Sequence, residues 1–73
     1  MTDVDEGAVL VNGQPLLVRA ASLRGLLEDL KLDPERPGLA VALNDEVVPR
    51  SEWHSTAVRP GDRIEVVSAV AGG

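Results

Sequence analysis

The sequence predicts an α+β fold in which a mixed β-sheet packs on one α-helix. The chain has 73 residues, enough for one domain with a small core. Short apolar runs are joined by tight-turn sequences, a pattern typical of β-hairpins. One segment, residues 23–30, repeats its leucines at helical spacing. A helix with a single apolar stripe must pack on one face of a sheet, so these two observations together predict the fold.

The first two strands are predicted at residues 8–11 and 14–18, on either side of Asn12-Gly13. An Asn-Gly pair favours a type I′ turn, because that turn requires a positive φ at both central residues. Pro15 has no N–H group, so we expect its nitrogen to face away from the ladder of hydrogen bonds. These residues therefore predict a β-hairpin.

A helix is predicted next, with Ser22 as its N-cap because a serine hydroxyl can accept a hydrogen bond from a first-turn N–H group. One apolar stripe follows at the positions i, i+3, i+4 and i+7: Leu23, Leu26, Leu27 and Leu30. Pro34 cannot continue the helix, so we expect the helix to end near Leu32. Residues 33–38 are then a loop.

The second half of the chain predicts three more strands. Residues 39–43 alternate large and small apolar side chains, and Asn44-Asp45 forms a tight turn into a short strand at 46–48 that Pro49 ends. Residues 51–57 hold one short helical turn. Residues 59–62 fit a type II turn, and the last strand covers residues 63–70.

The resulting order, β-β-α-β-β-β, lets the first and last strands lie side by side in the middle of the sheet. This is the β-grasp arrangement of ubiquitin-like domains. We expect residues 1–7 to be a disordered acidic leader, residues 8–71 to be the β-grasp domain, and residues 72–73 to be a flexible tip.

Composition excludes several classes of function. The net charge of −5 lacks the basic footprint of a nucleic-acid-binding protein. The chain has no cysteine and a single histidine, His54, so it predicts no metal site. No signal peptide and no membrane span are visible, which predicts a cytoplasmic location. Trp53, the lone aromatic residue, is predicted to cap an aliphatic core, and Arg50 to make a local structural bond.

Alternation of side chains along the strands assigns two faces to the sheet. Facing the helix we place Val9, Val11, Leu16, Val18, Leu39, Val41, Leu43, Ile64 and Val66. Facing away we place Leu10, Leu17, Ala40, Ala42, Val67 and Ala69, with Glu65 among them. A solvated sheet face is usually polar, whereas this face is mostly apolar. We therefore expect it to be a contiguous surface on which a partner protein docks.

The chain ends in Val70, Ala71, Gly72 and Gly73. Two terminal glycines give a thin peptide that can thread into a narrow partner site. Val70 and Ala71 are uncharged, which suits a buried channel because a charged residue there would have to be desolvated. The one reactive group at the tip is the α-carboxylate of Gly73, which needs activation before it can react.

Three segments carry a resemblance to a known family: Val-Val-Pro-Arg-Ser-Glu-Trp at residues 47–53, Arg-Pro-Gly-Asp-Arg-Ile at 59–64, and Val-Ala-Gly-Gly at 70–73. Together they resemble ThiS, the bacterial sulfur carrier of thiazole synthesis, and the resemblance extends from Ala8 to the end of the chain. It implies that an E1-like adenylating enzyme uses ATP to activate Gly73. A sulfur-donor enzyme then supplies sulfur for a thiocarboxylate, and thiazole synthase accepts that sulfur for the thiazole of thiamine. The chain would bind no cofactor itself, would be a carrier and not an enzyme, and would be monomeric when free.

Two alternatives remain open at the level of sequence. The small subunit of molybdopterin synthase and other thiocarboxylate carriers also end in Gly-Gly, although the run from Pro49 to Trp53 favours the thiazole carrier. A ubiquitin-like modifier or a pure interaction module would belong to a different class. A modifier would form an isopeptide bond with a target lysine, whereas a pure interaction module would not need the terminal glycines.

Overall fold

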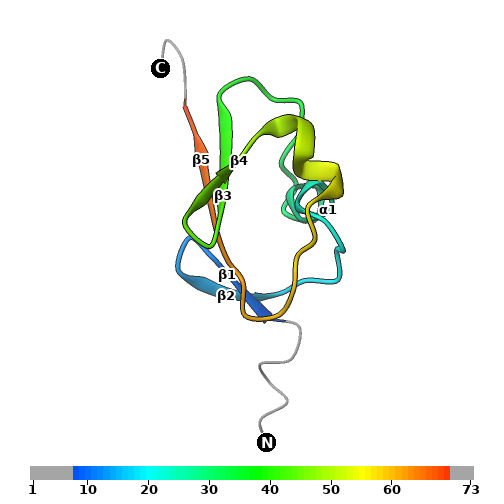
Figure 1. Ribbon diagram of the computed structural model, residues 1–73, viewed down its shortest axis with the longest axis vertical. Coiled ribbons are helices and arrows are strands. Elements are labelled where there is room, and N and C mark those ends of the chain that lie inside the picture. The colour runs from blue at the N-terminus through cyan, green and yellow to red at the C-terminus, as the bar shows by residue number, and fades with distance from the viewer. Residues whose placement is uncertain (1–7, 70–73) are drawn as a thin grey trace, which may run out of the picture.

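The computed structural model describes residues 8–69, and these residues form one five-stranded sheet with its helices on one face (Figure 1). The order across the sheet is β2-β1-β5-β3-β4. The strands are β1 (Ala8–Val11), β2 (Gln14–Leu17), β3 (Leu39–Leu43), β4 (Glu46–Val48) and β5 (Arg63–Ser68). The central pair β1 and β5 is parallel and every other pair is antiparallel. The mixed sheet with its first and last strands adjacent confirms the predicted fold.

Both hairpins are closed by two-residue turns with left-handed backbone. Asn12 and Gly13 have φ angles of 51° and 86°, as the predicted type I′ turn requires. The Asn12 side chain also accepts from the Val66 N–H at 2.8 Å and donates to the Val66 carbonyl at 3.2 Å. The amide thereby continues the β1–β5 pairing beyond the end of β1. Pro15 lies on the edge strand β2, opposite Leu10, where a missing N–H group is tolerated.

Helix α1 (Leu23–Asp29) begins as the sequence predicts and ends earlier. The Ser22 hydroxyl accepts a hydrogen bond from the Gly25 N–H at 3.2 Å and so caps the first turn. The predicted end near Leu32 is wrong because Lys31 adopts a φ of 65°. The Leu32 N–H then donates to the Leu27 carbonyl at 2.8 Å, closing a Schellman motif.

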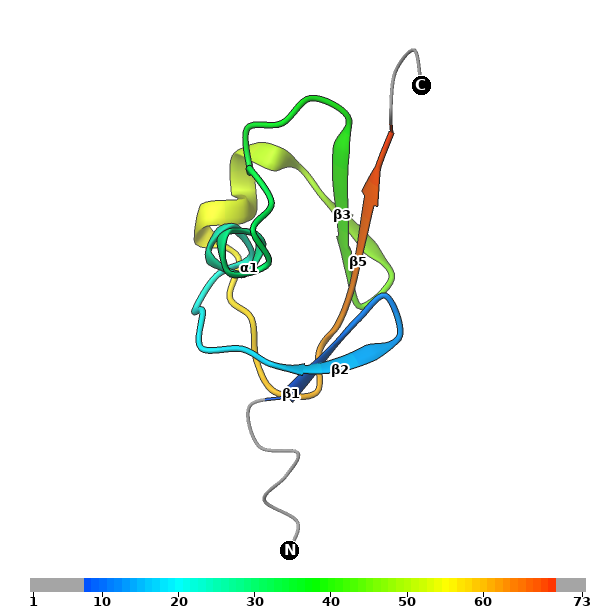
Figure 2. The same ribbon diagram turned by 180° about the vertical axis from the view of Figure 1, so that it is seen from behind.

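The 3₁₀-helix η2 (Arg50–Ser55) lies beside α1 on the same face of the sheet, as Figure 2 shows from behind. It starts directly after Pro49 and confirms the short helical turn expected there. Before β5, residues 59–62 turn with Gly61 at a φ of 89°, as predicted, and the Asp62 N–H donates to the Arg59 carbonyl at 3.1 Å. Strand β2 stops at Leu17, one residue short of the prediction.

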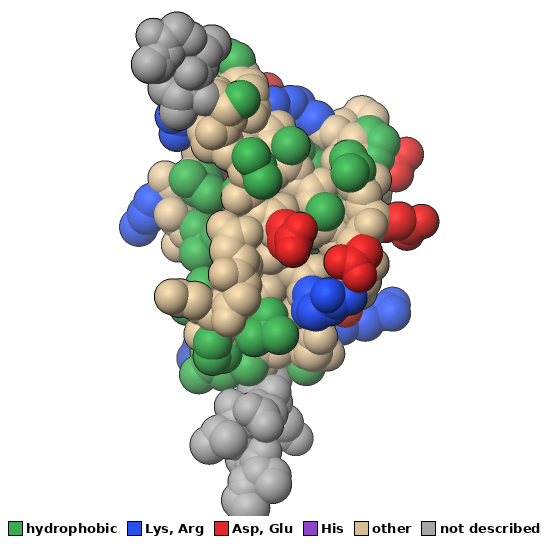
Figure 3. Space-filling model, turned by 90° about the vertical axis from the view of Figure 1, so that its left-hand side faces the viewer, with side chains coloured by type: hydrophobic (Ala, Val, Ile, Leu, Met, Phe, Trp, Pro, Cys, Tyr) green, Lys and Arg blue, Asp and Glu red, His purple; other side chains and the backbone are tan. Residues whose placement is uncertain are grey.

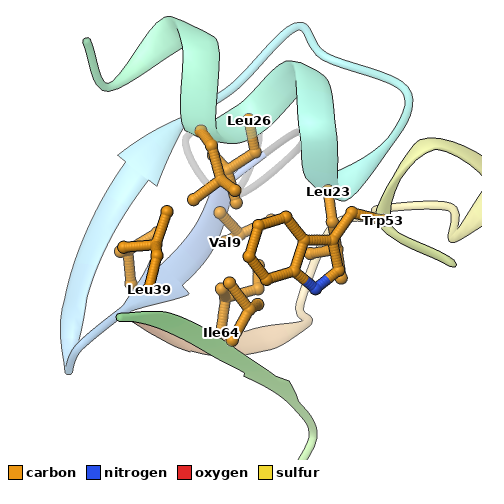
Figure 4. Packing of buried hydrophobic residues seen from close by; sticks show 9 residues of the cluster. Val9, Leu23, Leu26, Leu39, Trp53 and Ile64 are labelled. Carbon is orange, nitrogen blue, oxygen red and sulfur yellow. The ribbon is translucent and has the colours of Figure 1, made fainter. Parts of the chain in front are cut away.

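The core fills the space between α1, η2 and the inner face of the sheet (Figure 4). Its buried members are Val9, Val11, Leu23, Leu26, Leu27, Leu39, Val41, Trp53 and Ile64. All but one are aliphatic, as expected from the composition. Trp53 lies against Leu23 and Ile64 with 2% of its surface exposed, so its predicted role as a core cap is confirmed.

Leu16 is the one residue predicted to face the helix that the structure leaves out of the core. Its pairing with Val9 places it on the predicted face, yet 36% of its surface is exposed. The reason is its position on the edge strand β2, where the helix does not reach. Leu43, Val18 and Val66 are partly buried and pack against the core.

Candidate functional site

Strand β5 leads from the centre of the sheet to one end of the molecule, where the described chain stops at Ala69 (Figure 1). The sequence-predicted tail residues Val70, Ala71, Gly72 and Gly73 lie outside the described residues. What the structure does describe is the anchor from which this tail continues. The Ala69 N–H donates to the Gly38 carbonyl at 2.9 Å, one step beyond the β3–β5 ladder.

Gly38 approaches Ala69 more closely than any residue with a side chain could. A Cβ atom built on Gly38 would lie 2.5 Å from the Ala69 carbonyl oxygen, a separation that real Cβ atoms do not show. Gly38 also has a φ of 83°, which favours glycine. The contact therefore requires glycine at this position, and the backbone conformation favours it.

Residues 33–38, which we call the exit loop, are held from the other side by Arg50. The guanidinium of Arg50 donates to the Pro34 carbonyl and, at 2.7 Å, to the Arg36 carbonyl. It lies 4.9 Å from the centroid of the Trp53 ring. A planar guanidinium suits two acceptors and an aromatic face together, whereas a lysine ammonium does not. Arg50 thus makes structural hydrogen bonds, but the prediction that they are local is wrong, because the acceptors lie in a loop 14 and 16 residues earlier in the chain.

Trp53 connects Arg50 and the exit loop to the core and to the sheet. Its ring is buried, and its Nε1–H donates to the Val48 carbonyl at 2.8 Å. Residues of η2 and the end of β4 therefore brace the exit loop, which in turn contacts Ala69. Sequence reasoning did not find this support, because Arg50 and the carbonyls that it contacts are 14 and 16 residues apart.

The outer face of the sheet carries an apolar group next to Ala69. Strand pairing sets Ala40 beside Val67 and Ala42 beside Val47. Val67 is 60% exposed and Val47 is 77% exposed. We call Ala40, Ala42, Val47, Val67 and Ala69 the upper patch. Val47 was missed by the sequence reasoning, although alternation along β4 could have found it, since Val48 faces inward opposite Val41.

Leu10 and Leu17 form a second group on β1 and β2, which we call the lower patch. Leu17 is 75% exposed and Leu10 is 37% exposed. Figure 3 shows acidic and basic side chains between hydrophobic groups on one face of the molecule. Strand pairing sets Arg63 of β5 beside Leu10 and Glu65 beside Ala42, between the two patches. Glu65 was already expected on this face, and Arg63 of the same strand joins it there, so charged residues lie between the two apolar groups. The single docking surface expected from the sequence stays a prediction.

Arg63 is tied to the neighbouring hairpin. Its Nη2 lies 2.7 Å from Asp45 Oδ2, and this hydrogen bond, followed by the charge of Asp45, raises the pKa of Arg63 above its ordinary value. The pair is exposed and contributes little to stability. We call Arg63 and Glu65, which lie between the two patches, the charged strip.

Within residues 8–69, no three histidine, cysteine or acidic side chains gather where they could hold a metal ion. No helix in that range has the length and apolar character needed to cross a membrane. His54 is exposed at the surface of η2.

Comparison with known proteins places the chain in a family. The model of the ThiS family matches residues 9–73. The sulfur carrier protein ThiS of Escherichia coli is 36% identical over 66 residues, which cover 89% of this chain and 97% of that protein. A thiazole synthase of Paramagnetospirillum magneticum is 33% identical over 66 residues, which cover 89% of this chain but only 20% of that longer protein.

A solved structure agrees with these sequence matches. The crystal structure of the thiamine biosynthesis protein ThiS of Geobacter metallireducens superposes with a TM-score of 0.73 at 33% identity. The superposition covers 90% of this chain and 99% of the other. The family match over residues 9–73, the sequence relatives and the shared fold all agree. The chain therefore belongs to the ThiS family, whose members are small sulfur carrier proteins of thiamine biosynthesis and not enzymes.

Proposed function

We propose that the α-carboxylate of Gly73 is the group on which this carrier holds sulfur. The observation that supports it is the Gly72-Gly73 end, which the family match includes. In the proposed cycle an E1-like enzyme transfers AMP from ATP to the carboxylate and releases pyrophosphate. Sulfur delivered at the oxidation level of sulfide by a sulfur-donor enzyme attacks the acyl carbon, so that a C–S bond forms while the C–O bond to AMP breaks. The product is a thiocarboxylate and AMP is released.

The thiocarboxylate explains why the carrier needs no catalytic side chain. This group is ionised at neutral pH, and its sulfur is a soft, strong nucleophile, so no general base is required on the carrier. Bound sulfur also does not diffuse away as free sulfide. Activation is left to the partner, which supplies ATP chemistry, and the carrier acts as a protein cosubstrate.

Thiazole synthase is the proposed acceptor of the sulfur. The thiazole synthase of Paramagnetospirillum magneticum contains a segment similar to nearly the whole of this chain. A carrier and its acceptor joined in one polypeptide hold the reacting groups at a high effective concentration. We infer that this carrier reacts with a thiazole synthase in the same way.

We place the docking surface for these partners on the upper patch. It adjoins Ala69, so a partner bound there lies next to the point from which the tail continues. Ala40, Ala42, Val67 and Ala69 of the expected surface belong to it, and Val47 is added. Leu10 and Leu17 were expected to share this surface, and the charged strip at Arg63 and Glu65 now sets them apart. Complementary apolar groups on the partner would fit the exposed Val67 and Val47.

The free protein is proposed to be a cytoplasmic monomer that uses ATP only through its activating partner. The alternatives from the sequence are less well supported. A small subunit of molybdopterin synthase would share the fold and the Gly-Gly end, but the matching family model is that of ThiS, and the Escherichia coli relative is a sulfur carrier protein ThiS. A ubiquitin-like modifier would require isopeptide formation in place of sulfur transfer.

The experiment is intact mass spectrometry of the protein incubated with an adenylating enzyme, ATP and a sulfur donor. Exchange of oxygen for sulfur at the activated carboxylate adds about 16 Da, and fragmentation should place the gain on Gly73. A variant lacking Gly73 is the matched control and should gain nothing. A gain that maps to an internal residue, or no gain in the complete reaction, would contradict the proposal. An isopeptide-linked product would favour the modifier instead.

A further inference from the structure

We propose that Gly38 is a positioning residue, which fixes the point where the C-terminal tail leaves the sheet so that Gly73 reaches the partner's active site. This inference rests on the proposed function. It begins from the contact between two segments far apart in sequence: the exit loop, residues 33–38, and Ala69 at the end of β5. The Ala69 N–H donates to the Gly38 carbonyl, and the Ala69 carbonyl oxygen faces the position that a Gly38 side chain would take.

The contact leaves no room for even a methyl group. An alanine Cβ at position 38 would lie 2.5 Å from the Ala69 oxygen, whereas ordinary contacts begin at 3.4 Å. Ala69 and the exit loop would have to separate by about 0.9 Å to restore that distance. Ala69 is the last described residue before the tail, so a shift there moves the starting point of every residue that follows.

The exit loop is held too firmly to absorb this shift by itself. Arg50 donates to the carbonyls of Pro34 and Arg36 from one side. Within the loop, the Arg36 N–H donates to the Asp33 carbonyl at 3.0 Å, and the Glu35 N–H donates to Asp33 Oδ1 at 2.9 Å. Arg24 of α1 also bonds to Glu35 at 3.1 Å. With the loop fixed, the strand end at Ala69 is the part that moves.

Arg50 therefore helps to position the tail indirectly. It does not touch Ala69, and it acts through the loop that carries Gly38. The ring of the buried core residue Trp53 lies against the Arg50 guanidinium and helps to hold it in place. A misplacement of about 1 Å at a reacting group can reduce turnover by up to about 100-fold. A firm anchor at Ala69 reduces the volume that Gly73 must search before it is adenylated.

The chain offers a matched control in Gly61. Gly61 has a φ of 89°, close to that of Gly38, but a Cβ there would meet no atom within 4 Å. It precedes β5, whereas the Gly38 contact follows the other end of the same strand. Gly61→Ala therefore introduces the same backbone strain without touching Ala69. The comparison of Gly38→Ala with Gly61→Ala therefore separates the effect of the clash with Ala69 from the effect of placing alanine at a positive φ.

The first measurement is backbone amide hydrogen exchange at Ala69 in the free protein. We expect exchange about ten-fold faster or more in Gly38→Ala than in Gly61→Ala, because the hydrogen bond to residue 38 is lost. Arg50→Lys, which keeps the charge and leaves Gly38 in place, should accelerate the same amide to a smaller extent. If the Ala69 amide exchanges at the same rate in the wild type, in Gly38→Ala and in Arg50→Lys, the proposal is wrong.

The second measurement is adenylation of each variant by the activating enzyme. We expect Gly38→Ala to lower kcat at least about ten-fold relative to Gly61→Ala while KM for the carrier stays the same, because docking is intact and delivery is impaired. A loss confined to KM, or equal turnover by the two variants, would contradict a positioning role. If wild-type protein itself is not adenylated, the proposed function is wrong. If Gly38→Ala does not fold, Arg50→Lys carries both measurements.

Discussion

At the scale of single residues, Lys31 determines where the helix ends. It adopts a φ of 65°, a conformation that costs a residue with a side chain about 1–2 kcal/mol. Its backbone closes the last turn, since the Lys31 N–H donates to the Glu28 carbonyl at 3.0 Å and the following Leu32 N–H reaches Leu27. Glycine is the usual residue at this position of a Schellman motif. The conformation of Lys31 is therefore locally unfavourable, but the hydrogen bonds of the Schellman motif compensate for it.

Replacing Lys31 with glycine should stabilise the protein by about 0.5–1 kcal/mol, because glycine adopts this backbone conformation without steric cost. Lys31→Ala is the matched control, since it removes the same side chain but keeps the unfavourable φ. The measurement is the free energy of unfolding in urea for both variants. Equal stability of the two would show that the left-handed backbone at Lys31 imposes no penalty.

Gly72 allows a second prediction at this scale, based on its sequence. Gly72→Val should block adenylation and leave the melting temperature unchanged, because a β-branched side chain restricts the backbone and widens the peptide. The same change at Gly7, near the other end of the chain, serves as the control and should leave adenylation intact. Normal turnover by Gly72→Val would mean that the tail does not enter a narrow site.

At the scale of elements, α1 owes its stability to packing more than to helix propensity. It has only seven residues, including Gly25, and so short a helix is not stable by itself in water. Three of its leucines, Leu23, Leu26 and Leu27, are fully buried against the sheet and Trp53. The same helix bears the Arg24 side chain that bonds to the exit loop. Loss of packing would therefore affect both the core and the loop.

Leu27→Ala should lower the free energy of unfolding by about 2–5 kcal/mol, because it removes buried methyl groups and leaves a cavity. That is a large share of the stability of a domain of this size. Asp29→Ala, an exposed change two residues along the same helix, is the control and should stay within about 0.5 kcal/mol of wild type. Thermal or urea unfolding tests this prediction. Similar free energies of unfolding for the two variants would mean that the leucine stripe is not part of the core.

At the scale of the whole molecule, both helices lie on one face of the sheet, and no helix or strand among residues 8–69 covers the other face (Figures 2 and 3). Charges on β5 divide that face into the upper patch beside Ala69 and the lower patch around Leu10 and Leu17. The upper patch, the exit loop and the last described residue lie at one end of the sheet. In the proposed function, docking of the partner and delivery of the tail therefore take place at the same end of the sheet.

Val67→Asp should weaken binding to the adenylating enzyme at least about ten-fold, because a buried, unpaired charge is costly at an interface. It should change the stability of the free carrier by less than about 0.5 kcal/mol, since Val67 is 60% exposed. Leu17→Asp makes the same kind of change in the lower patch and should leave binding nearly unchanged.

Calorimetry of binding and the melting temperatures of the free variants test this prediction. Equal loss of affinity for Val67→Asp and Leu17→Asp would show that both patches dock, as the sequence alone suggested. Lost stability with unchanged affinity for Val67→Asp would place Val67 in the core. Unchanged affinity for both would require another docking site, and Arg50 would be the first to test.

Most of the elements could be predicted from the amino-acid sequence, because their signals are local. Asn12-Gly13 specifies its turn through φ angles that few residues adopt, and Ser22 caps the next N–H groups along the chain. Periodicity separated helix from strand, and with alternation it assigned inner and outer faces correctly for most strand residues. The terminal Gly72-Gly73 is likewise readable without any structure.

Only the tertiary structure decided which of these elements touch, because such contacts join residues distant in sequence. Leu16 has the correct face but is exposed, since burial depends on what lies above an edge strand. The neighbours of Val67 follow from strand order and register, which put charges between the two apolar patches. The contact of Gly38 with Ala69, braced by Arg50, has no local signal, because it requires the loop and the strand end to be in place together. Local conformation follows from each residue's own backbone preferences, whereas proximity is set by the folded chain as a whole.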